Sequence, residues 1–342
     1  MENIGLGIAI VIVAALLQGS FMVPMAYVRT WKWENSWAVF TLLGMFVFNW
    51  ILAIWTIPSL GSVYSSVPMT AILIQVLFGL LWGIGAVCFG LGMAAVGFAL
   101  GYAVIMGLVL GLGAFIPLAL LQPTEIATPK GMLILLGLAV VLVGIAVCGR
   151  AGIRKEREQG TRAGEITRTS TLSIGAGLLV CLLAGIFSCF PNVGFAFSKP
   201  LVNAATRLGA EERWVGNAVW AILFTFGGLV NLAYCGYLFQ KNRSLALFGN
   251  QGLVRNVLLV ALMAAMWIGS FALYGLGAQF MGEWGPVVGW SVFIALSIGV
   301  ASLWGIAQGE WRDTSSATRR WMFTGLAVIA AAILVLAFAS AR

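Results

Sequence analysis

The sequence predicts an all-α membrane protein with ten transmembrane helices arranged as two inverted five-helix repeats. Of its 342 residues, 61% are hydrophobic and only 9% are charged, whereas a water-soluble domain carries about 25% charged residues. This apolar content is sufficient for about ten helices of roughly 20 residues, the length that spans a bilayer. Too few charged and turn-forming residues remain for a soluble α/β sheet that binds dinucleotides or phosphates.

Ten apolar runs, each bounded by charged residues or by Pro and Gly clusters, are the predicted transmembrane helices. The first run follows Glu2 and lacks the basic segment of a signal peptide, and it is longer than a signal peptide's apolar region. We therefore interpret it as a retained helix. The predicted spans are residues 4–26, 37–57, 71–93, 98–121, 131–149, 173–198, 214–240, 253–277, 286–307 and 320–340.

Lysine and arginine residues are distributed unequally between alternate connections of the predicted helices. The odd-numbered connections hold 14 of them, whereas the even-numbered connections and the two termini together hold 5. Connections that are rich in basic residues remain in the cytoplasm. Both termini are therefore expected on the opposite, external side.

The longest polar segment divides the chain almost in half. We expect residues 150–172 to be a basic cytoplasmic linker between an N-terminal repeat, residues 1–149, and a C-terminal repeat, residues 173–342. Each repeat contains five predicted spans. Because five is odd, two related halves must insert with opposite orientations, as in many secondary transporters.

An internal match supports a relation between the two halves. The match has a constant offset of 185 residues. It aligns Trp82, Phe89, Gly90, Leu91, Gly92 and Gly97 with Trp267, Tyr274, Gly275, Leu276, Gly277 and Gly282. The two aromatic pairs carry most of this evidence, because glycine matches arise easily in a chain with 43 glycines. Coincidence in a biased composition is the alternative explanation.

The charge and the cysteines do not indicate other classes of partner. The net charge is +8, but much of it lies in one connection, where membrane topology explains it without a nucleic-acid partner. The sequence has no histidine and no CxxC pair, so we expect neither a metal site nor a cofactor. The cysteines are expected to pack in apolar surroundings, and they are Cys88, Cys148, Cys181, Cys189 and Cys235.

Four stripes of polar or aromatic residues recur at the spacing of one helix face. Lipid would reject the polar stripe in the sixth span, so we expect it to face the bundle interior or a water-filled cavity. Aromatic faces combined with amides and hydroxyls suit a neutral sugar, although simple helix packing is an alternative explanation for the aromatic stripes. The stripes are Ser188, Asn192, Phe195 and Lys199; Gln75, Trp82 and Phe89; Trp267 and Tyr274; and Trp290, Ser297 and Trp304.

Ionisable residues near the predicted spans are few. No Asp or Glu lies in the middle of a span, so a proton-coupling carboxylate would have to lie near a span end. Glu283 is the leading candidate, with Lys199 on the same external side and Glu34 before the second span as further candidates. A solvated loop position for Glu283 and a membrane-interface anchor for Lys199 are the alternatives.

These residues also resemble a known family, the bacterial L-rhamnose-proton symporters of the drug/metabolite transporter superfamily. The similar segments occur in order along nearly the whole chain. They are residues 31–37 (WKWENSW), 82–85 (WGIG), 90–91 (GL), 150–152 (RAG), 155–157 (KER), 185–188 (GIFS), 199–200 (KP), 266–267 (MW) and 310–311 (EW). Compared with the family pattern, residues 86–88 are apolar here and Phe89 stands at a tyrosine position.

The resemblance implies proton-driven import of a monosaccharide, most simply L-rhamnose, across a bacterial inner membrane, with both termini periplasmic. The protein is then not an enzyme, and its partners are the sugar, the proton and the bilayer; we expect a monomer. Combined with the stripes, the resemblance gives these candidate substrate-binding residues: Gln18, Trp82, Phe89, Tyr102, Ser188, Asn192, Lys199, Trp267, Ser270, Tyr274 and Trp290.

Two other functions remain as alternatives. A metabolite or drug exporter of the same superfamily would bind a larger, more apolar ligand and ignore sugars. An intramembrane enzyme or a sensor is a different class; an enzyme needs positioned nucleophiles or acid–base pairs, and none is visible at helical spacing.

Overall fold

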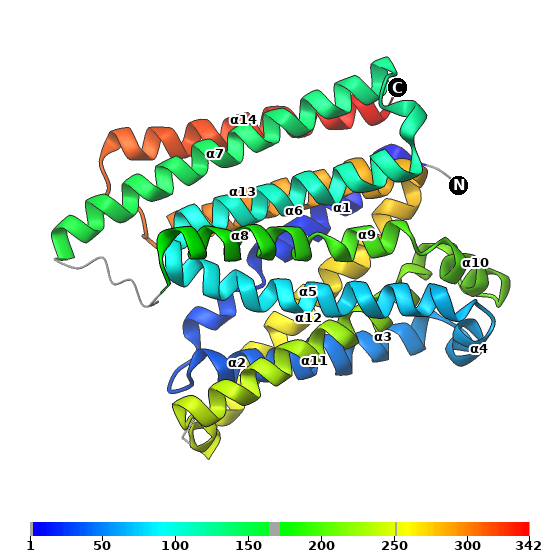
Figure 1. The fold of residues 1–342 in the computed structure, drawn as a ribbon, viewed down its shortest axis with the longest axis horizontal. Coiled ribbons are helices and arrows are strands. Elements are labelled where there is room, and N and C mark those ends of the chain that lie inside the picture. The colour runs from blue at the N-terminus through cyan, green and yellow to red at the C-terminus, as the bar shows by residue number, and fades with distance from the viewer. Residues whose placement is uncertain (1–2, 164–171, 250–251, 342) are drawn as a thin grey trace.

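The computed structural model describes residues 3–163, 172–249 and 252–341, and in these residues the regular secondary structure is helical throughout. Long helices lie side by side along one direction (Figure 1). The ten predicted membrane spans are confirmed. They are Ile4–Tyr27, Trp33–Thr56, Met69–Val96, Phe98–Leu121, Pro129–Gly160, Gly175–Arg207, Glu212–Asn242, Leu253–Phe280, Gly282–Ala307 and Ser316–Ala339.

Six spans each consist mainly of one long α-helix. Leucine, alanine and other apolar residues make up most of each core, and Pro117 in α6 is tolerated where a neighbouring side chain can satisfy the freed carbonyl group. These helices are α5 (Met69–Val96), α6 (Phe98–Leu121), α7 (Pro129–Ala163), α11 (Gly216–Asn242), α12 (Leu253–Phe280) and α14 (Ser316–Ala341).

The other four spans are interrupted. Proline lacks the N–H group that continues a helix, and Pro24, Pro191 and Pro286 each lie in a short segment next to such a break. The segments are α1 (Ile4–Ser20) with η1 (Val23–Tyr27); α2 (Trp33–Phe40), η2 (Thr41–Phe48) and α3 (Asn49–Thr56); α8 (Ile174–Ser188), α9 (Phe190–Ala196) and α10 (Lys199–Arg207); and η6 (Gly282–Trp284), η7 (Gly285–Gly289) and α13 (Trp290–Ala307).

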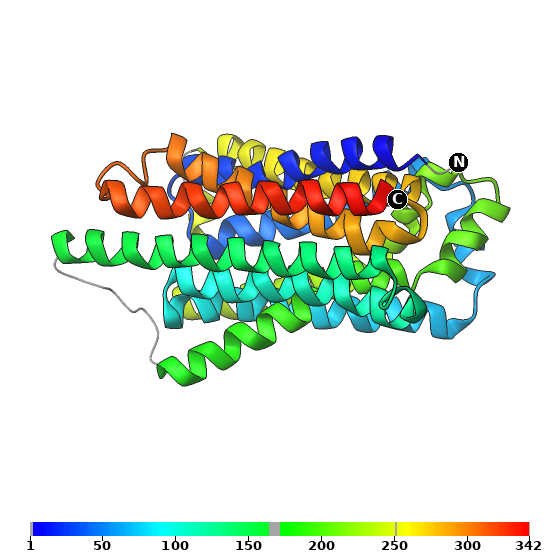
Figure 2. The same ribbon diagram turned by 90° about the horizontal axis from the view of Figure 1, so that it is seen from above.

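Both termini lie at one end of the bundle (Figures 1 and 2). We call this end the terminus side and the opposite end, where α7 ends and α8 begins, the linker side. Short helices join the spans at the two ends. They are α4 (Leu60–Ser65), η3 (Pro123–Glu125), η4 (Glu212–Trp214) and η5 (Leu245–Gly249).

The fifth helix is longer than the sequence predicts. Residues 150–163, expected to begin a linker, continue α7 to Ala163, while residues 164–171 lie outside the described part of the chain. Tertiary contacts hold this extension: Lys155 Nζ lies 2.7 Å from Glu310 Oε2, and the Glu158 carboxylate accepts hydrogen bonds from Ser315 N (2.7 Å) and Thr318 Oγ1 (2.6 Å). The charges that suggested a loop therefore belong to a helix that packs against the start of α14.

The long helices of the spans pack against one another in pairs. Helix α7 packs along α14 (Figure 1), α5 packs against α8 and α11, and α1 packs against α12 and α13. Glycines allow the closest approaches between helices. A Cβ at Gly79 would lie 2.2 Å from the Leu223 carbonyl oxygen, and a Cβ at Gly83 would lie 2.7 Å from that of Gly227. Helices α5 and α11 are therefore in backbone contact.

Candidate functional site

Inside the bundle, eight of the aromatic side chains lie in continuous ring contact, and we call these eight the aromatic column. It begins at Trp82 of α5 and Trp267 of α12, whose rings are stacked with centroids 5.9 Å apart and an interplanar angle of 17°. Trp82 and Trp267 each lie near the middle of a 28-residue helix. The cluster continues toward the terminus side, and its members are Trp82, Trp220, Phe224, Trp267, Phe271, Tyr274, Trp290 and Phe293.

Helical spacing explains the column. Residues three or four apart share one helix face, so α11 presents Trp220 and Phe224 together, with ring centroids 5.3 Å apart. In α12, the rings of Trp267 and Phe271 are 5.2 Å apart. The ring of Tyr274 follows on the same face, 5.0 Å from Phe293 of α13.

Asn192 of α9 is fully buried beside the column and makes three side-chain hydrogen bonds to three other segments. Its Nδ2 donates to the carbonyl oxygens of Gly113 (2.7 Å) and Pro286 (2.6 Å), and its Oδ1 accepts from the Tyr274 hydroxyl. The Gly113 carbonyl is available because Pro117, four residues later in α6, has no N–H to donate to it. We call this set of bonds the Asn192 network.

Trp290 closes the same region. Its Nε1 donates to the Val109 carbonyl oxygen of α6 at 3.0 Å. The indole packs directly over Gly113, where a Cβ would lie only 2.2 Å from Trp290 Nε1. On the terminus side, Asn192, Tyr274 and Trp290 are thus hydrogen-bonded within the protein rather than free to bind a ligand.

Toward the middle of the bundle, by contrast, several polar groups are free. The Ser270 hydroxyl donates to Gln18 Oε1 at 2.7 Å, but Gln18 Nε2 donates to no described residue, and neither do the indole N–H groups of Trp82 and Trp267. Gln18 and Trp82 are only half-buried. These groups can therefore donate hydrogen bonds to a ligand placed between α1, α5 and α12.

Three predicted residues lie outside this group. The Phe89 and Tyr102 rings contact each other edge to face, with centroids 6.2 Å apart, on the linker side of Trp82. Ser188, at the end of α8, packs against Gly85, where a Cβ would lie 2.9 Å from the Ser188 hydroxyl oxygen. No ring contact or hydrogen bond in the described structure joins Phe89, Tyr102 or Ser188 to the aromatic column.

The ionisable candidates lie at the two ends of the bundle. Lys199 Nζ and Glu283 Oε1 are 3.7 Å apart on the terminus side, and their side chains are 75% and 71% exposed. Glu34 lies on the linker side and is only 3% exposed. Its Oε1 accepts hydrogen bonds from Ser244 Oγ (2.6 Å) and Asn242 Nδ2 (2.9 Å), which stabilise the ionised carboxylate.

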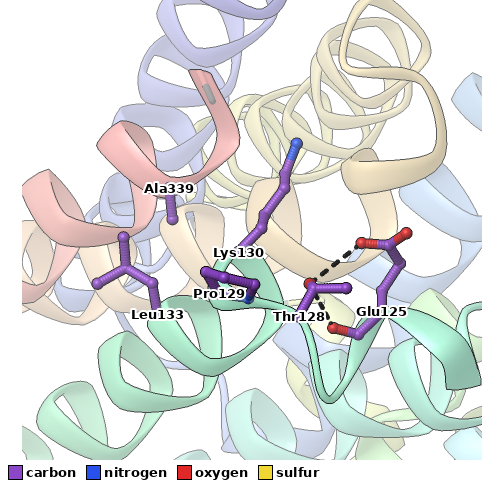
Figure 3. Close-up of a pocket in the computed structure, with 6 residues that line it drawn as sticks. All are labelled: Glu125, Thr128, Pro129, Lys130, Leu133 and Ala339. Atoms are coloured by element: carbon purple, nitrogen blue, oxygen red, sulfur yellow. Dashed lines mark hydrogen bonds between the residues drawn. The ribbon is translucent and has the colours of Figure 1, made fainter.

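Two hollows lie away from the predicted residues. One of about 300 Å³ opens on the terminus side, between the start of α7 and the end of α14 (Figure 3). There the Lys130 ammonium lies 4.4 Å from the centre of the Trp284 ring. The second, of about 570 Å³, is an apolar groove between α6, α7 and α8. The first hollow is lined by Glu125, Thr128, Pro129, Lys130, Leu133 and Ala339.

The side chains of the column are uncharged. The column offers indole, phenol and phenyl faces with amide and hydroxyl groups. Within the described residues, Cys, Asp and Glu side chains form no group of three that could hold a metal ion. Such surroundings favour an uncharged ligand that has both apolar faces and hydroxyl groups.

The prediction from sequence missed Trp220, Phe224, Phe271 and Phe293 of the column, and it missed Gly113. A signal for the first two was present, since Trp220, Phe224 and Asn231 of α11 lie on one face at helical spacing. Asn231 does face inward, where its Oδ1 accepts from Trp37 Nε1 at 2.8 Å. A signal for Gly113 was also present, since it lies four residues before Pro117, which has no N–H to donate to its carbonyl group.

Comparisons with known proteins agree with one another. A family described as L-rhamnose-proton symport protein matches residues 1–341. The L-rhamnose-proton symporter of Shigella sonnei is 28% identical over 322 residues, which cover 92% of each chain. The L-rhamnose-proton symporter of Yersinia pestis (strain Pestoides F) is 27% identical over 314 residues, which cover 90% of each chain.

Proposed function

The chain belongs to the L-rhamnose-proton symport family, and from this premise we propose that it is a transporter, not an enzyme, that imports L-rhamnose together with a proton by alternating access. The observation that carries the proposal beyond the family match is the uncharged aromatic column in the middle of a ten-span bundle. An uncharged sugar needs no countercharge in the membrane interior, where charged groups are unfavourable.

The sugar site is proposed at Gln18, Trp82, Trp267 and Ser270. The C–H face of a pyranose ring packs against indole faces. The free donors of Gln18 and of the two indoles then bind sugar hydroxyls. This arrangement supports the assignment because these donors lack a partner within the described protein.

The conformation is proposed to be closed on the terminus side. The Asn192 network and Trp290 join α6, α9, α12 and the η7–α13 span there, whereas the free donors lie nearer the linker side. The distribution of Lys and Arg favours a periplasmic terminus side in a bacterial inner membrane. In the outward-open conformation, Asn192 and Tyr274 lose their protein partners and become available to the sugar.

The two halves are proposed to be inverted repeats. If each span of the first half corresponds to the span five positions later, the α5–α8 contact corresponds to the α12–α1 contact. In the same way, α6–α8 corresponds to α13–α1, and α5–α11 to α12–η2. All of these pairs are in contact, which supports a pseudo-two-fold arrangement with the site between the halves.

Proton coupling is proposed to use a carboxylate near a span end. Glu283 is the first choice because it is accessible to external water and faces Lys199 on α10, which continues the interrupted sixth span. Glu34 is the second choice, because the hydrogen bonds from Asn242 and Ser244 fix its carboxylate to the region where α11 ends. The transporter is proposed to work as a monomer in the bilayer.

The deciding experiment is uptake of radiolabelled L-rhamnose by cells or vesicles that carry the protein, with and without an uncoupler. Uptake that collapses with the uncoupler, and alkalinisation of the medium on addition of sugar, are expected. Sugar uptake that ignores a collapsed pH gradient would contradict proton coupling. In a thermal-shift panel, stabilisation by lipophilic cations but by no monosaccharide would instead indicate an exporter.

A further inference from the structure

Besides Gln122 Oε1, two polar atoms on the terminus side are buried without a hydrogen-bond partner in the described structure. They are Nε1 of Trp220, whose side chain is fully buried, and Oε1 of Gln75, whose side chain is 1% exposed. Buried polar groups are nearly always hydrogen-bonded, so an unpartnered donor and an unpartnered acceptor in one region require an explanation. Neither residue belongs to the proposed sugar site.

The same short helix, α9, packs over both residues, and α12 also lies against the Trp220 N–H, since a Cβ at Gly275 would lie 3.1 Å from Trp220 Nε1. Gln75 Nε2 donates to the Gly194 carbonyl oxygen at 2.9 Å, and a Cβ at Gly194 would lie 2.8 Å from Gln75 Oε1. The adjacent Phe195 stacks on Trp220, with ring centroids 5.0 Å apart and an interplanar angle of 10°. Gln75 and Trp220 lie on α5 and α11, which are in backbone contact at Gly79 and Leu223.

Helix α9 is built as a separate segment of the sixth span. It has seven residues, with Pro191 in its first turn, and it is separated from α8 and α10 by non-helical residues. Side-chain hydrogen bonds from Asn192 hold it to other spans. Helix α9 can therefore move off Gln75 and Trp220 once the Asn192 network and the Gln75–Gly194 hydrogen bond are released.

We propose that Gln75 and Trp220 form a second carbohydrate subsite, which is uncovered when α9 moves away from α5 and α11. In it, the Trp220 N–H donates to one sugar hydroxyl and Gln75 Oε1 accepts from another. The pyranose ring takes the place of the Phe195 ring on the indole face. This inference rests on the proposed function, and it identifies residues that bind the sugar as it enters from the terminus side.

The test compares Trp220→Phe and Gln75→Leu with the wild-type chain in L-rhamnose uptake. Trp220→Phe removes the indole N–H and keeps an aromatic ring, whereas Gln75→Leu removes both the free Oε1 and the Nε2 that donates to the Gly194 carbonyl oxygen. The half-saturating sugar concentration is expected to rise by about fivefold to tenfold in each. Trp50→Phe is the matched control, because the Trp50 N–H is already bonded within the protein, to Thr225 Oγ1 at 2.8 Å. The half-saturating sugar concentration of this variant should stay near that of the wild type.

Monodeoxy analogues of the sugar distinguish binding from a structural role. The analogue that lacks the hydroxyl bound by Trp220 should compete less well than L-rhamnose in the wild type, but equally well in Trp220→Phe. If the variants do not fold, Gln75→Cys in right-side-out vesicles gives a second measurement. A membrane-impermeant thiol reagent should label it above the background of the wild-type cysteines, and L-rhamnose should slow the labelling.

The outcomes separate the two proposals. The subsite alone would be overturned if the wild-type chain takes up L-rhamnose and both variants have an unchanged half-saturating sugar concentration. Labelling of Gln75→Cys that the sugar does not slow would overturn it as well. A wild-type chain that takes up no L-rhamnose would overturn the proposed function, and the subsite with it.

Discussion

Replacing Gly113 by alanine is expected to open the contact that closes the terminus side. The new Cβ would lie 2.2 Å from Trp290 Nε1 and 2.9 Å from its Cδ1. Comfortable contact between heavy atoms needs about 3.5 Å. The indole must therefore move by roughly 1 Å or more, and its 3.0 Å hydrogen bond to the Val109 carbonyl cannot survive that shift.

Two contributions set the free energy by which Gly113→Ala destabilises the closed conformation. Overpacking of a tight contact costs about 1–3 kcal/mol, and a buried N–H that loses its acceptor costs about 1–3 kcal/mol more. Even the lower sum, about 2 kcal/mol, changes an equilibrium by roughly thirtyfold. The closed conformation is therefore expected to become much less populated, and L-rhamnose uptake to fall, because each transport cycle must pass through it.

Gly111→Ala is the control on the same helix. A Cβ there would lie 3.7 Å from Leu142, which is ordinary contact, and it gains the same helix propensity as alanine at position 113. The measurement is the melting temperature of the purified proteins, together with uptake. If Gly113→Ala melts and transports like Gly111→Ala, the proposed closure by Trp290 is refuted.

Three further predictions follow. Trp82→Ala and Trp267→Ala should each weaken L-rhamnose binding by about 1 kcal/mol or more if the sugar stacks on these rings; unchanged affinity in an equilibrium binding assay would place the sugar elsewhere. Glu283→Gln should abolish uptake driven by a pH gradient but spare counterflow exchange, and a wild-type pH dependence in this variant would assign the coupling to another group. Gly79→Ala should lower the melting temperature, because its Cβ would lie 2.2 Å from a backbone oxygen of α11, with a destabilisation of about 1–3 kcal/mol. Gly90→Ala on the same helix meets no atom within 4 Å and should melt like the wild type.

Local chemistry was sufficient to predict the spans, but not where α7 ends. A helix in lipid needs about 20 apolar residues whatever its neighbours, so each span is visible in its own stretch of sequence. The end of α7 depends instead on partners far along the chain. Lys155 pairs with Glu310, and Glu158 bonds to Ser315, so a charged stretch that resembles a loop becomes helical.

The candidate site could also be predicted only in part from the sequence. Spacing identified Trp82, Asn192, Trp267 and Tyr274 as inward-facing, and the structure places all of them inside the bundle. Spacing did not indicate that Asn192 is satisfied by three protein partners while Gln18 keeps a free donor. Hydrogen-bond partners from different spans decide which polar groups remain available to a ligand, and no single helix contains that information.

The sequence by itself determined the membrane class, the ten spans and the apolar, uncharged character of the interior, because bilayer thickness and the exclusion of charge from lipid act on each segment separately. Only the tertiary structure decided which helices meet, which polar groups are bonded within the protein, and that Trp220 Nε1 and Gln75 Oε1 lack a hydrogen-bond partner in the described structure beneath α9. Those features arise from contacts such as Gly113 beneath Trp290, where the fit between distant side chains sets the geometry.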